Sequence, residues 1–530
     1  MDTDALARYC ESLWNARAAI NATMDEIARY VAPDRQGFTS GKLDASDEGR
    51  DKIWDSTPED AALTLASALH GMLTNPATEW LALELMGLEQ ETNEETDEFL
   101  QNVNKAMLAV FSDADTGFQQ EVNTFYMDLV CFGWAVFLCE MKDGKGLRFR
   151  AVPPSQCALA ENSDGRVDTV LRRWTMTPGQ MAEEFGADAL SGQVKDALEG
   201  RNQSKTFPVS HLVAPREKMP GDLQLRTGRR AKKTAREAAF VSVYFETQNK
   251  NILREGIFLE LPYMVPRWGK RSGEVYGRGP GHSCLPDMRV LNRVAFSQLV
   301  GAEKLADPPL LVADDSAVGK IKTHAGGITM YRPMSSQGEE IRQLPVTYQL
   351  DVAEVVLEKR REAIRAAFLN DRIQLAGGPQ MTATEVIARE RKQNIVLGPV
   401  LGRLESEFLG PMSGRVFLLL YRGGALNPPE TLEGRDLRAR YLSPIGRAQR
   451  QGEAEAFSRA LEYLAPAAQA DPTILDNFDF NAAARDSREM FGFPREYLRS
   501  EEEVEKIRQA RAEAQAEAAM AAQLAAKAGI

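Results

Sequence analysis

The residues with the clearest capacity for chemistry are the closely spaced glycines of Gly273–Gly281, which read GEVYGRGPG. Glycines at such spacing let a backbone approach a phosphate group. However, Gly277, Gly279 and Gly281 do not match the dinucleotide pattern G-x-G-x-x-G, and no acidic residue follows at the distance which that pattern requires. The segment therefore predicts a structural turn, and a nucleotide-dependent enzyme that uses Gly273–Gly281 is the alternative interpretation.

The remaining reactive side chains form no known catalytic or metal-binding pattern. Four histidines stand far apart, outside H-E-x-x-H and away from cysteines at metal-ligand spacing: His70, His211, His282 and His324. The sequence contains neither a G-x-S-x-G elbow nor a G-x-x-x-x-G-K-S/T phosphate loop. It thus predicts a structural protein and not an enzyme, with no catalytic residue, metal or cofactor.

Five cysteines are scattered along the chain without a C-x-x-C pair: Cys10, Cys131, Cys139, Cys157 and Cys284. An odd and dispersed set of this kind fits reduced thiols better than a disulfide framework. We expect all five thiols to be buried and inert.

Length and composition limit the class of protein. The 530 residues are too many for one compact core, so the length predicts several domains or one elongated subunit. The longest apolar runs, Trp134–Cys139 and Val416–Tyr421, are far shorter than the ~20 residues that a membrane helix requires, and the N-terminus lacks a secretory signal. We expect a protein without a membrane partner that stays in the cytoplasm where it is made. The formal net charge of −12 predicts only loose contact with DNA.

The first 281 residues mix helical and strand patterns, which predicts an α+β domain. Apolar positions at helical spacing predict helices over residues 4–31, 57–73, 91–111 and 118–130. In the second of these helices, Thr57 is the expected N-cap. The Asp143-Gly144 turn predicts a hairpin between residues 133 and 152, and further strands are expected at 167–174, 241–246 and 257–261.

Inside this domain, Arg226–Arg236 holds six basic residues and no acidic one. Because no aromatic side chain interleaves these charges, the pattern favours a solvated loop between strands, with DNA contact as the alternative. The role of the segment stays open between these two interpretations.

The chain after residue 284 predicts two long helices separated by a short β-rich insert. An apolar face repeated from Met288 to Leu299 defines the first helix, which ends before Asp307. Residues 310–349 hold short strands punctuated by Gly and Pro, and a second helix is expected from Asp351 to Arg372. Two helices joined in this way predict an antiparallel stalk with a compact tip.

A loop is predicted at Ile373–Met381, because Gly377-Gly378-Pro379 cannot lie inside a helix. Thr382 is expected to cap a long helix that follows. Kinks are expected where Gly398-Pro399 and Gly410-Pro411 interrupt this helix.

The C-terminal part is expected to be helical from Pro444 to Leu464 and again from Ser500 to Lys527. The last helix is rich in alanine, so we expect it to pack through alanine against identical neighbours. A cytoplasmic coiled-coil scaffold is a further interpretation, but it rests on this helix alone.

One long segment resembles a known family. The stretch from Trp268 to Asn292, WGKRSGEVYGRGPGHSCLPDMRVLN, resembles the head-to-tail connector, or portal, family of short-tailed bacteriophages. Further matches are Asp55-Ser56-Thr57, Leu73-Thr74-Asn75-Pro76, Trp80 and Tyr441–Arg450, in the same order along the whole chain. The resemblance implies a dodecameric ring at one capsid vertex, built of wing, stem, clip and crown domains around a DNA channel.

Transferred onto this sequence, the resemblance implies an elongated, mainly helical α+β subunit divided at specific residues. The implied parts are the N-terminal wing (1–281), stem helix 1 (282–306), the clip (307–350), stem helix 2 (351–372), the channel or tunnel loop (373–381), the C-terminal wing with a long kinked helix (382–446) and the crown with its barrel helix (447–530).

The resemblance also implies where DNA lies and which partners bind. Residues expected near DNA are those of the channel loop: Leu375, Ala376, Gly377, Gly378, Pro379, Gln380 and Met381. Lys320, Lys322 and Lys359 are candidate phosphate neighbours, with an exposed solvated face as the alternative for each. The implied partners are further copies of the chain, double-stranded DNA without sequence specificity, the major capsid and scaffolding proteins, the terminase large subunit and a tail adaptor protein. The implied location is the portal vertex of the virion, after assembly in the host cytoplasm.

Overall fold

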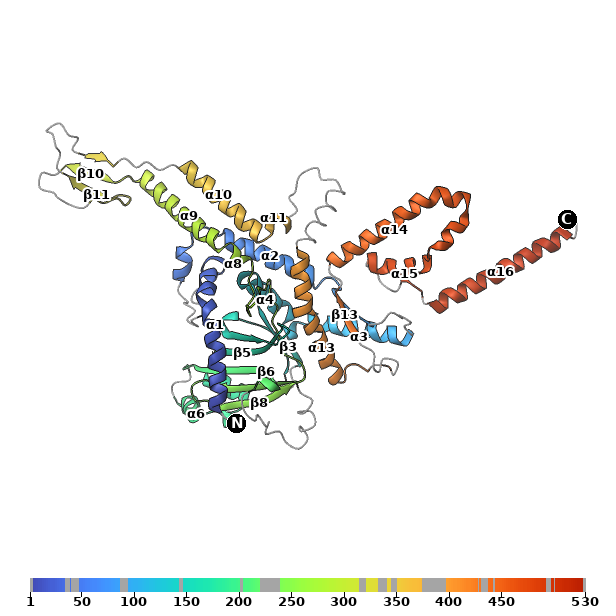
Figure 1. The fold of residues 1–530 in the computed structure, drawn as a ribbon, viewed down its shortest axis with the longest axis horizontal. Helices are drawn as coiled ribbons and strands as arrows, with labels where there is room; N and C mark the ends of the chain where they lie inside the picture. Colours follow the sequence, from blue (N-terminus) through green and yellow to red (C-terminus); the bar gives the residue numbers. More distant parts are fainter. Residues whose placement is uncertain are drawn as a thin grey trace. The chain divides into compact units, whose positions relative to one another are not determined.

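A five-stranded antiparallel sheet of strand order β4-β5-β6-β7-β8 lies at the centre of the part of the chain shown at the bottom of Figure 1. The computed structural model divides the chain into two units, Met1–Tyr441 and Leu442–Ile530. It describes residues 3–527 apart from residues 34–38, 40–46, 86–93, 143–145, 201–203, 220–238, 314–320, 332–340, 345–349, 374–396, 428, 430–436, 442–443, 492–496 and 500.

Strands and helices of the first unit occur in runs, such as β2 to β5 and β6 to β9 between groups of helices, as is typical of an α+β domain. Its helices are α1 (Thr3–Val31), α2 (Thr57–Leu73), α3 (Glu94–Ser112), α4 (Phe118–Phe132), α5 (Pro178–Phe185), α6 (Gly192–Glu199), α8 (Pro280–Ser283), α9 (Leu285–Ala306), α10 (Leu350–Ala367), α11 (Asn370–Ile373) and α13 (Gly410–Arg422). Its strands are β1 (Leu81–Leu85), β2 (Val136–Lys142), β3 (Gly146–Val152), β4 (Cys157–Glu161), β5 (Val167–Met176), β6 (Phe207–Pro215), β7 (Phe240–Glu246), β8 (Ile252–Phe258), β9 (Tyr263–Met264), β10 (Leu310–Ala313), β11 (Ile328–Tyr331), β12 (Ile341–Gln343) and β13 (Leu437–Tyr441).

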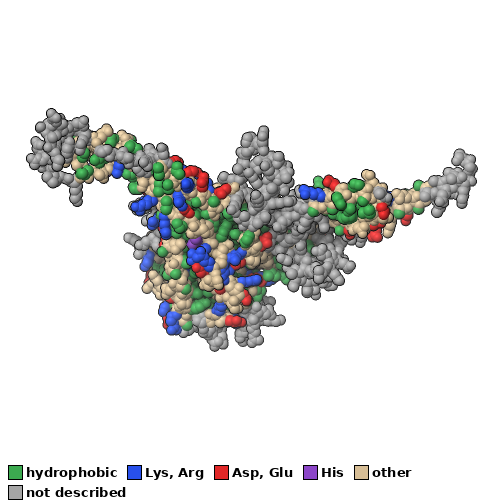
Figure 2. Space-filling model, turned by 45° about the horizontal axis from the view of Figure 1, so that its top comes forward, with side chains coloured by type: hydrophobic (Ala, Val, Ile, Leu, Met, Phe, Trp, Pro, Cys, Tyr) green, Lys and Arg blue, Asp and Glu red, His purple; other side chains and the backbone are tan. Residues whose placement is uncertain are grey.

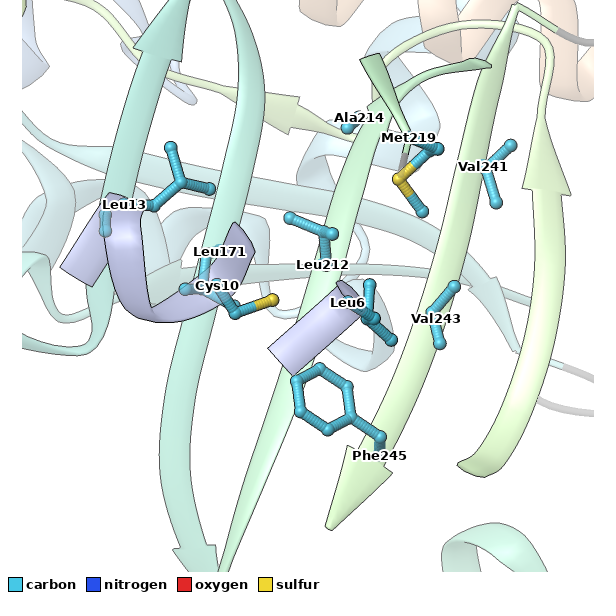
Figure 3. Packing of buried hydrophobic residues seen from close by; sticks show 11 residues of the cluster. Leu6, Cys10, Leu13, Leu171, Leu212, Ala214, Met219, Val241, Val243 and Phe245 are labelled. Carbon is cyan, nitrogen blue, oxygen red and sulfur yellow. The ribbon is translucent and has the colours of Figure 1, made fainter. Parts of the chain in front are cut away.

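The central sheet is covered on both faces. Leu6 and Cys10 of α1 pack against Leu212 of β6 and Val243 of β7, as Figure 3 shows. The opposite face carries a second core, in which helices α5 and α6 cover Val209 and neighbouring side chains. Because side chains alternate along a strand, Leu212 and Val209 point to opposite faces of β6. The mainly helical α+β class predicted from the sequence is confirmed.

A third core is built from aromatic side chains around the sheet β3-β2-β9. Phe125 of α4 lies between Phe137 of β2 and Phe408, with ring centroids 5.2 and 4.3 Å apart. Phe118 joins the same cluster and stacks on Trp80, which precedes β1. Aromatic side chains bury large apolar areas, so this cluster fixes α4 against the sheet.

Most predicted helices are confirmed, with corrections at their ends. Helix α2 spans Thr57–Leu73 as expected, but its N-cap is Ser56 and not Thr57, and the Thr57 N–H is satisfied by Asp55 Oδ1 at 2.9 Å. The strand expected at 257–261 is wrong in position, because β8 begins at Ile252 and ends at Phe258. The sequence did not predict β4, β6, α5 or α6, which are short or, in β6, contain proline. The basic segment Arg226–Arg236 lies outside the described residues.

The second stalk helix ends earlier than predicted. Helix α10 stops at Ala367, and the short α11 starts at Asn370. Leu369 between them adopts a left-handed conformation with φ 60°, which a helix interior does not allow. The break lets the Phe368 side chain become fully buried, so tertiary packing overrides the helical propensity of this stretch.

At Gly410-Pro411, one of the two positions where a kink was expected, the irregularity of the helix is a π turn. Residues 397–404 are helical, and the helix continues through a π-helical turn, Glu405–Leu409, into α13. Pro411 has no N–H and its ring clashes with the carbonyl four residues before it, so a wider turn at this position relieves the conflict. The helix expected to begin at Thr382 lies, at its start, outside the described residues.

The described residues of the second unit form helices joined by short connections. It contains α14 (Pro444–Ala470), α15 (Phe480–Phe491) and α16 (Glu501–Lys527). The expected end of α14 at Leu464 is wrong, because the helix continues through Pro466, which removes one backbone hydrogen bond without ending it. Phe457 of α14 packs against Phe478, with ring centroids 5.8 Å apart. The predicted alanine-rich final helix is confirmed as α16.

In the described part of the chain, no helix is both long and apolar enough to cross a bilayer. All five cysteines are buried, as the sequence predicted. Burial raises the pKa of the Cys10, Cys139, Cys157 and Cys284 thiols to about 12.

The thiols should therefore not react in the folded protein. At pH 8 a disulfide reagent such as DTNB should leave the native chain unmodified, because the reagent cannot reach the buried thiols and these thiols are not in the thiolate form. The same reagent should titrate five thiols per chain in guanidinium chloride. Rapid reaction of even one thiol in the native protein would contradict this expectation.

Candidate functional site

Helices α9 and α10 form a helical hairpin that projects from the body of the first unit, with the sheet β11-β10-β12 following α9 (Figure 1). Arg360 of α10 contacts Asp287 near the start of α9 at 2.6 Å, whereas Glu354 contacts Gln298 further along α9 at 3.0 Å. Between these two contacts the residue number rises along α9 and falls along α10, so the two helices are antiparallel. The predicted stalk of two helices with a small β tip is confirmed.

The base of the helical hairpin is tied to the segment before α2 by polar contacts. Asn292 of α9 accepts from the Trp54 N–H at 2.8 Å and donates to the Lys52 carbonyl at 3.0 Å. Arg361 of α10 donates to Asp55 at 3.0 Å, and the Asp55 side chain is only 5% exposed. One side-chain amide and one ion pair thus hold both helices to the same loop.

Glycines place the start of the helical hairpin against the end of α4. Gly133 caps α4 in a left-handed conformation with φ 74°. A Cβ at Gly277 would lie 2.1 Å from the Gly133 carbonyl oxygen, and one at Gly279 would lie 2.8 Å from the Gly133 Cα. A Cβ at Gly281 would lie 2.3 Å from the Cys131 carbonyl oxygen. Only glycine allows this approach, so the glycine segment, Gly273–Gly281, packs backbone against backbone.

This packing bears on the enzyme interpretation of the glycine segment. The sides of Gly277, Gly279 and Gly281 where a Cβ would point are occupied by the backbone of residues 131–133 and not open to a ligand. Helix α8, which follows directly, has only four residues. Both observations favour the structural turn that the sequence predicted.

A buried arginine, Arg267, lies six residues before the start of the glycine segment. Arg267 is 1% exposed and bonds Glu407 three times, through its backbone N–H at 2.9 Å, Nε at 3.2 Å and Nη2 at 2.7 Å. Its Nη1 donates to Glu161 at the end of β4. Lys270 Nζ also contacts Glu161, at 2.7 Å. We call Arg267, Glu407, Glu161 and Lys270 the arginine cluster.

The arginine cluster is electrostatically complete. Burial alone would lower the pKa of Arg267, but the bonds and charges of Glu407 and Glu161 raise it. Two carboxylates face two cations, and the guanidinium also donates to the Gly165 carbonyl at 2.9 Å and to the Val275 carbonyl at 3.4 Å. A buried charge is tolerated when it is paired and hydrogen-bonded in this way.

Sequence reasoning missed the arginine cluster. Glu161 and Glu407 lie far from Arg267 in sequence, and carboxylates are abundant in the chain. The one signal near it was the proline of Gly410-Pro411, which indicated an irregular helix beside Glu407.

Few of the predicted site residues can be placed. Leu375, Ala376, Gly377, Gly378, Pro379, Gln380, Met381 and Lys320 lie outside the described residues. Lys322 is exposed before β11, and Lys359 is exposed on α10, so the structure puts these two candidates on different elements. Ile373 ends α11. Within the described ranges, no group of three or more His, Cys, Asp or Glu side chains could hold a metal ion.

The first unit combines an α+β body with an antiparallel helical hairpin and a β tip, and the described part of the second unit is mainly helical. The model of the family described as bacteriophage head to tail connecting protein matches residues 3–498. The chain therefore belongs to this family, which confirms the resemblance found in the sequence.

Two curated relatives match almost the whole chain. It is 28% identical over 506 residues to the probable portal protein of Bordetella phage BPP-1, covering 94% of this chain and 89% of the relative. It is 27% identical over 529 residues to the portal protein of Salmonella phage epsilon15, covering 98% and 93%. Neither name denotes an enzyme.

The glycine contacts predict a large and local mutational effect. Gly277→Ala should lower the free energy of unfolding by about 3 kcal/mol or more, because the new Cβ meets backbone that cannot rotate away. Gly402→Ala in the helix of residues 397–404 is the control, since nothing lies within 4 Å of its Cβ position. Urea unfolding measures both, and equal effects would refute the close contact.

The histidines predict how stability depends on pH. Burial lowers the pKa of His211 well below its usual value, and burial together with Arg278 lowers the pKa of His282 to about 4. Below a pH of about 6.5 the unfolded chain binds protons that the folded chain does not. The free energy of unfolding should then fall as the pH drops, by about 1.4 kcal/mol per unit for each neutral histidine.

Urea unfolding of the full chain between pH 7 and 5 measures this slope. His282→Gln should reduce the slope, and its side-chain oxygen can still accept the Gly279 N–H that His282 Nδ1 accepts. His324→Gln, at an exposed position, is the control. Identical slopes for the two variants would contradict the expectation.

Proposed function

We propose that the chain is the subunit of the portal ring at one capsid vertex, through which double-stranded DNA is packaged and later ejected. The family membership and the names of the two relatives support this proposal. The single observation in the structure that carries it is the apolar outer surface of the helical hairpin.

Large apolar side chains are exposed on both helices of the hairpin. On α9, Phe296 and Leu299 are 45% and 44% exposed, and on α10, Val352 and Val355 are 57% and 55% exposed. Figure 2 shows hydrophobic side chains along the projecting hairpin, with acidic and basic side chains near its base. Exposed apolar surface of this kind marks an interaction site.

The exposed apolar residues of α10 lie on one side of the helix. Val352 and Val355 are three residues apart, on the side opposite the buried Leu357 and Ile364. A second copy of the chain is the partner that we assign to this face, because neighbouring subunits in a closed ring each cover part of the other.

We further propose that the parts of the subunit have the roles that the family implies. Residues 1–281 and 382–446 are the wing, 282–306 and 351–372 the stem, 307–350 the clip and 447–530 the crown. In this assignment the helical hairpin is the stem, and its β tip belongs to the clip.

The passage of DNA needs weak contacts along the channel. The net charge of −12 and the absence of Lys and Arg from Ile373–Met381 support weak contact, since tight phosphate binding would stall a moving duplex. Ile373–Met381 is proposed as the channel loop, and Lys322 and Lys359, both exposed, are proposed phosphate neighbours beside Lys320.

The same ring is proposed as a docking platform. The clip would bind the terminase large subunit, whose ATPase drives packaging, and later the tail adaptor protein. The wing would contact the major capsid and scaffolding proteins. The ring is expected to contain twelve copies, at the capsid vertex of the virion.

Electron microscopy of the purified protein tests the proposal. It should show rings with a central hole wide enough for a DNA duplex. A chain that remains a monomer under every condition would overturn it.

The apolar face predicts the effect of a single charge. Val355→Asp should abolish ring formation without lowering the melting temperature of the monomer, because an unpaired carboxylate would be buried between copies. Met141→Asp on β2 is the matched control, since Met141 is 45% exposed away from the hairpin. Size-exclusion chromatography with light scattering distinguishes the two variants. Normal rings from Val355→Asp would contradict the assigned interface.

A further inference from the structure

The π turn Glu405–Leu409 contains one residue more than a regular helix needs. The Gly410 N–H bonds the Glu405 carbonyl, which is the wide hydrogen bond of a π helix. Both flanks are fixed in the core. Leu401 and Leu404 on one side are 5% and 0% exposed, and Met412 on the other side is fully buried.

Arg415 locks the C-terminal flank further. Its Nε donates to the Cys139 carbonyl at 2.8 Å, and its Nη1 contacts the carbonyl of Glu260 at 3.2 Å. Neither flank can therefore rotate to absorb the additional residue. The surplus stays in the wide turn.

The wide turn directs adjacent side chains toward different partners. Phe408 and Leu409 are both 0% exposed, and Phe408 packs on Phe125 with ring centroids 4.3 Å apart. Glu407, directly before them, points to Arg267 and accepts its three bonds. The π turn thus places the Glu407 carboxylate against Arg267, from which the chain continues into the glycine segment.

We infer that the π turn, by holding Glu407 on Arg267, sets the direction of the helical hairpin and thereby the number of subunits in the ring. Glu407 is in this sense a positioning residue, and no partner contact is asked of it. The inference rests on the proposed function, because it presupposes that copies of the chain close into a ring.

The geometry of a closed ring makes its size sensitive to a small change. Neighbouring copies are rotated by about 30° in a ring of twelve and by about 28° in a ring of thirteen. Over the length of α9, about 33 Å at 1.5 Å per residue, a 2° change moves the far end by about 1 Å. A change of only about 2° at the base of the hairpin therefore alters how neighbouring copies meet at its far end.

The arginine cluster is better placed for this role than the other contacts at the base. Asn292 and Arg361 tie the hairpin to the loop before α2. Arg267 instead joins β4, the helix of residues 397–422 and the backbone that leads into α8 and α9. Of these three side chains, only Arg267 has a nearly inaccessible guanidinium that contacts two carboxylates, those of Glu161 and Glu407.

Glu407→Gln tests the inference, because it removes the charge and keeps the shape. Native mass spectrometry of the assembled protein gives the subunit number of each ring. The wild-type chain should form one ring size, and Glu407→Gln should shift this to a mixture with neighbouring subunit numbers. The melting temperature and circular dichroism of the same sample show that the variant is folded.

Glu184→Gln is the matched control. Glu184 of α5 contacts two cations, Lys142 of β2 at 2.8 Å and Arg254 of β8 at 3.1 Å, and none of these three residues belongs to the helical hairpin or the arginine cluster. It should lose comparable ion pairing and keep the wild-type ring size. A shift in ring size from Glu184→Gln as large as that from Glu407→Gln would overturn the inference.

Deletion of Ser406 tests the π turn itself. Ser406 is exposed, and its removal takes out the surplus residue while every charge of the arginine cluster remains. The deletion should convert the turn to a regular helix, withdraw Glu407 from Arg267 and broaden the ring sizes as Glu407→Gln does. A single wild-type ring size would show that the wide turn is not needed and would overturn its role.

The remaining outcomes are equally decisive. Glu407→Gln rings of one wild-type size overturn the inference, and so do folded variants that form no ring. If Glu407→Gln does not fold, Arg267→Lys is read in the same way, and failure of both variants to fold would make the cluster a determinant of folding and not of direction. Absence of rings from the wild-type chain would refute the proposed function instead.

Discussion

The direction of the helical hairpin depends on a contact between two stretches of backbone that only glycine permits. Gly133 ends α4 in a left-handed conformation, and Gly277 and Gly279 lie directly on it. Side chains can change rotamer to absorb strain, but backbone atoms in such contact cannot. The aromatic core around Phe125 fixes α4, and the glycine contact passes this fixed position on to α8 and α9.

The arginine cluster adds specificity at the same place. Burying a cation is costly, and a buried ion pair often stabilises a fold no more than apolar residues of the same size would. What such a pair does provide is a unique arrangement, because any other register leaves a charge without a partner. Arg267 therefore complements the glycines: they allow a close approach, and its bonds to Glu161 and Glu407 select one orientation.

Sequence reasoning found the hairpin because long apolar repeats and prolines mark its helices, and α9 ends at Ala306, just before the predicted stop at Asp307. It also recognised the glycine segment as a turn, but not what the glycines contact, since Gly133 is distant in sequence. The end of α10 at Ala367 had no signal in the sequence, because the following Leu369 favours helices and only the burial of Phe368 explains the break. The ion pairs of Arg267 depend on the finished fold and on no local pattern, so they could not be derived from the sequence.

The pairing of β1 with β13 has a consequence for synthesis of the chain. Leu81–Leu85 lies antiparallel to Leu437–Tyr441, so one strand waits for a partner 356 residues later, counted from residue 85 to residue 441. At about 5 to 20 residues per second, translation needs roughly 20 to 70 s to supply that partner. Glu407, which completes the arginine cluster, also emerges late. The nascent chain thus exposes its hairpin before the body that orients the hairpin is complete. Premature association of subunits must therefore be avoided until residue 441 has left the ribosome.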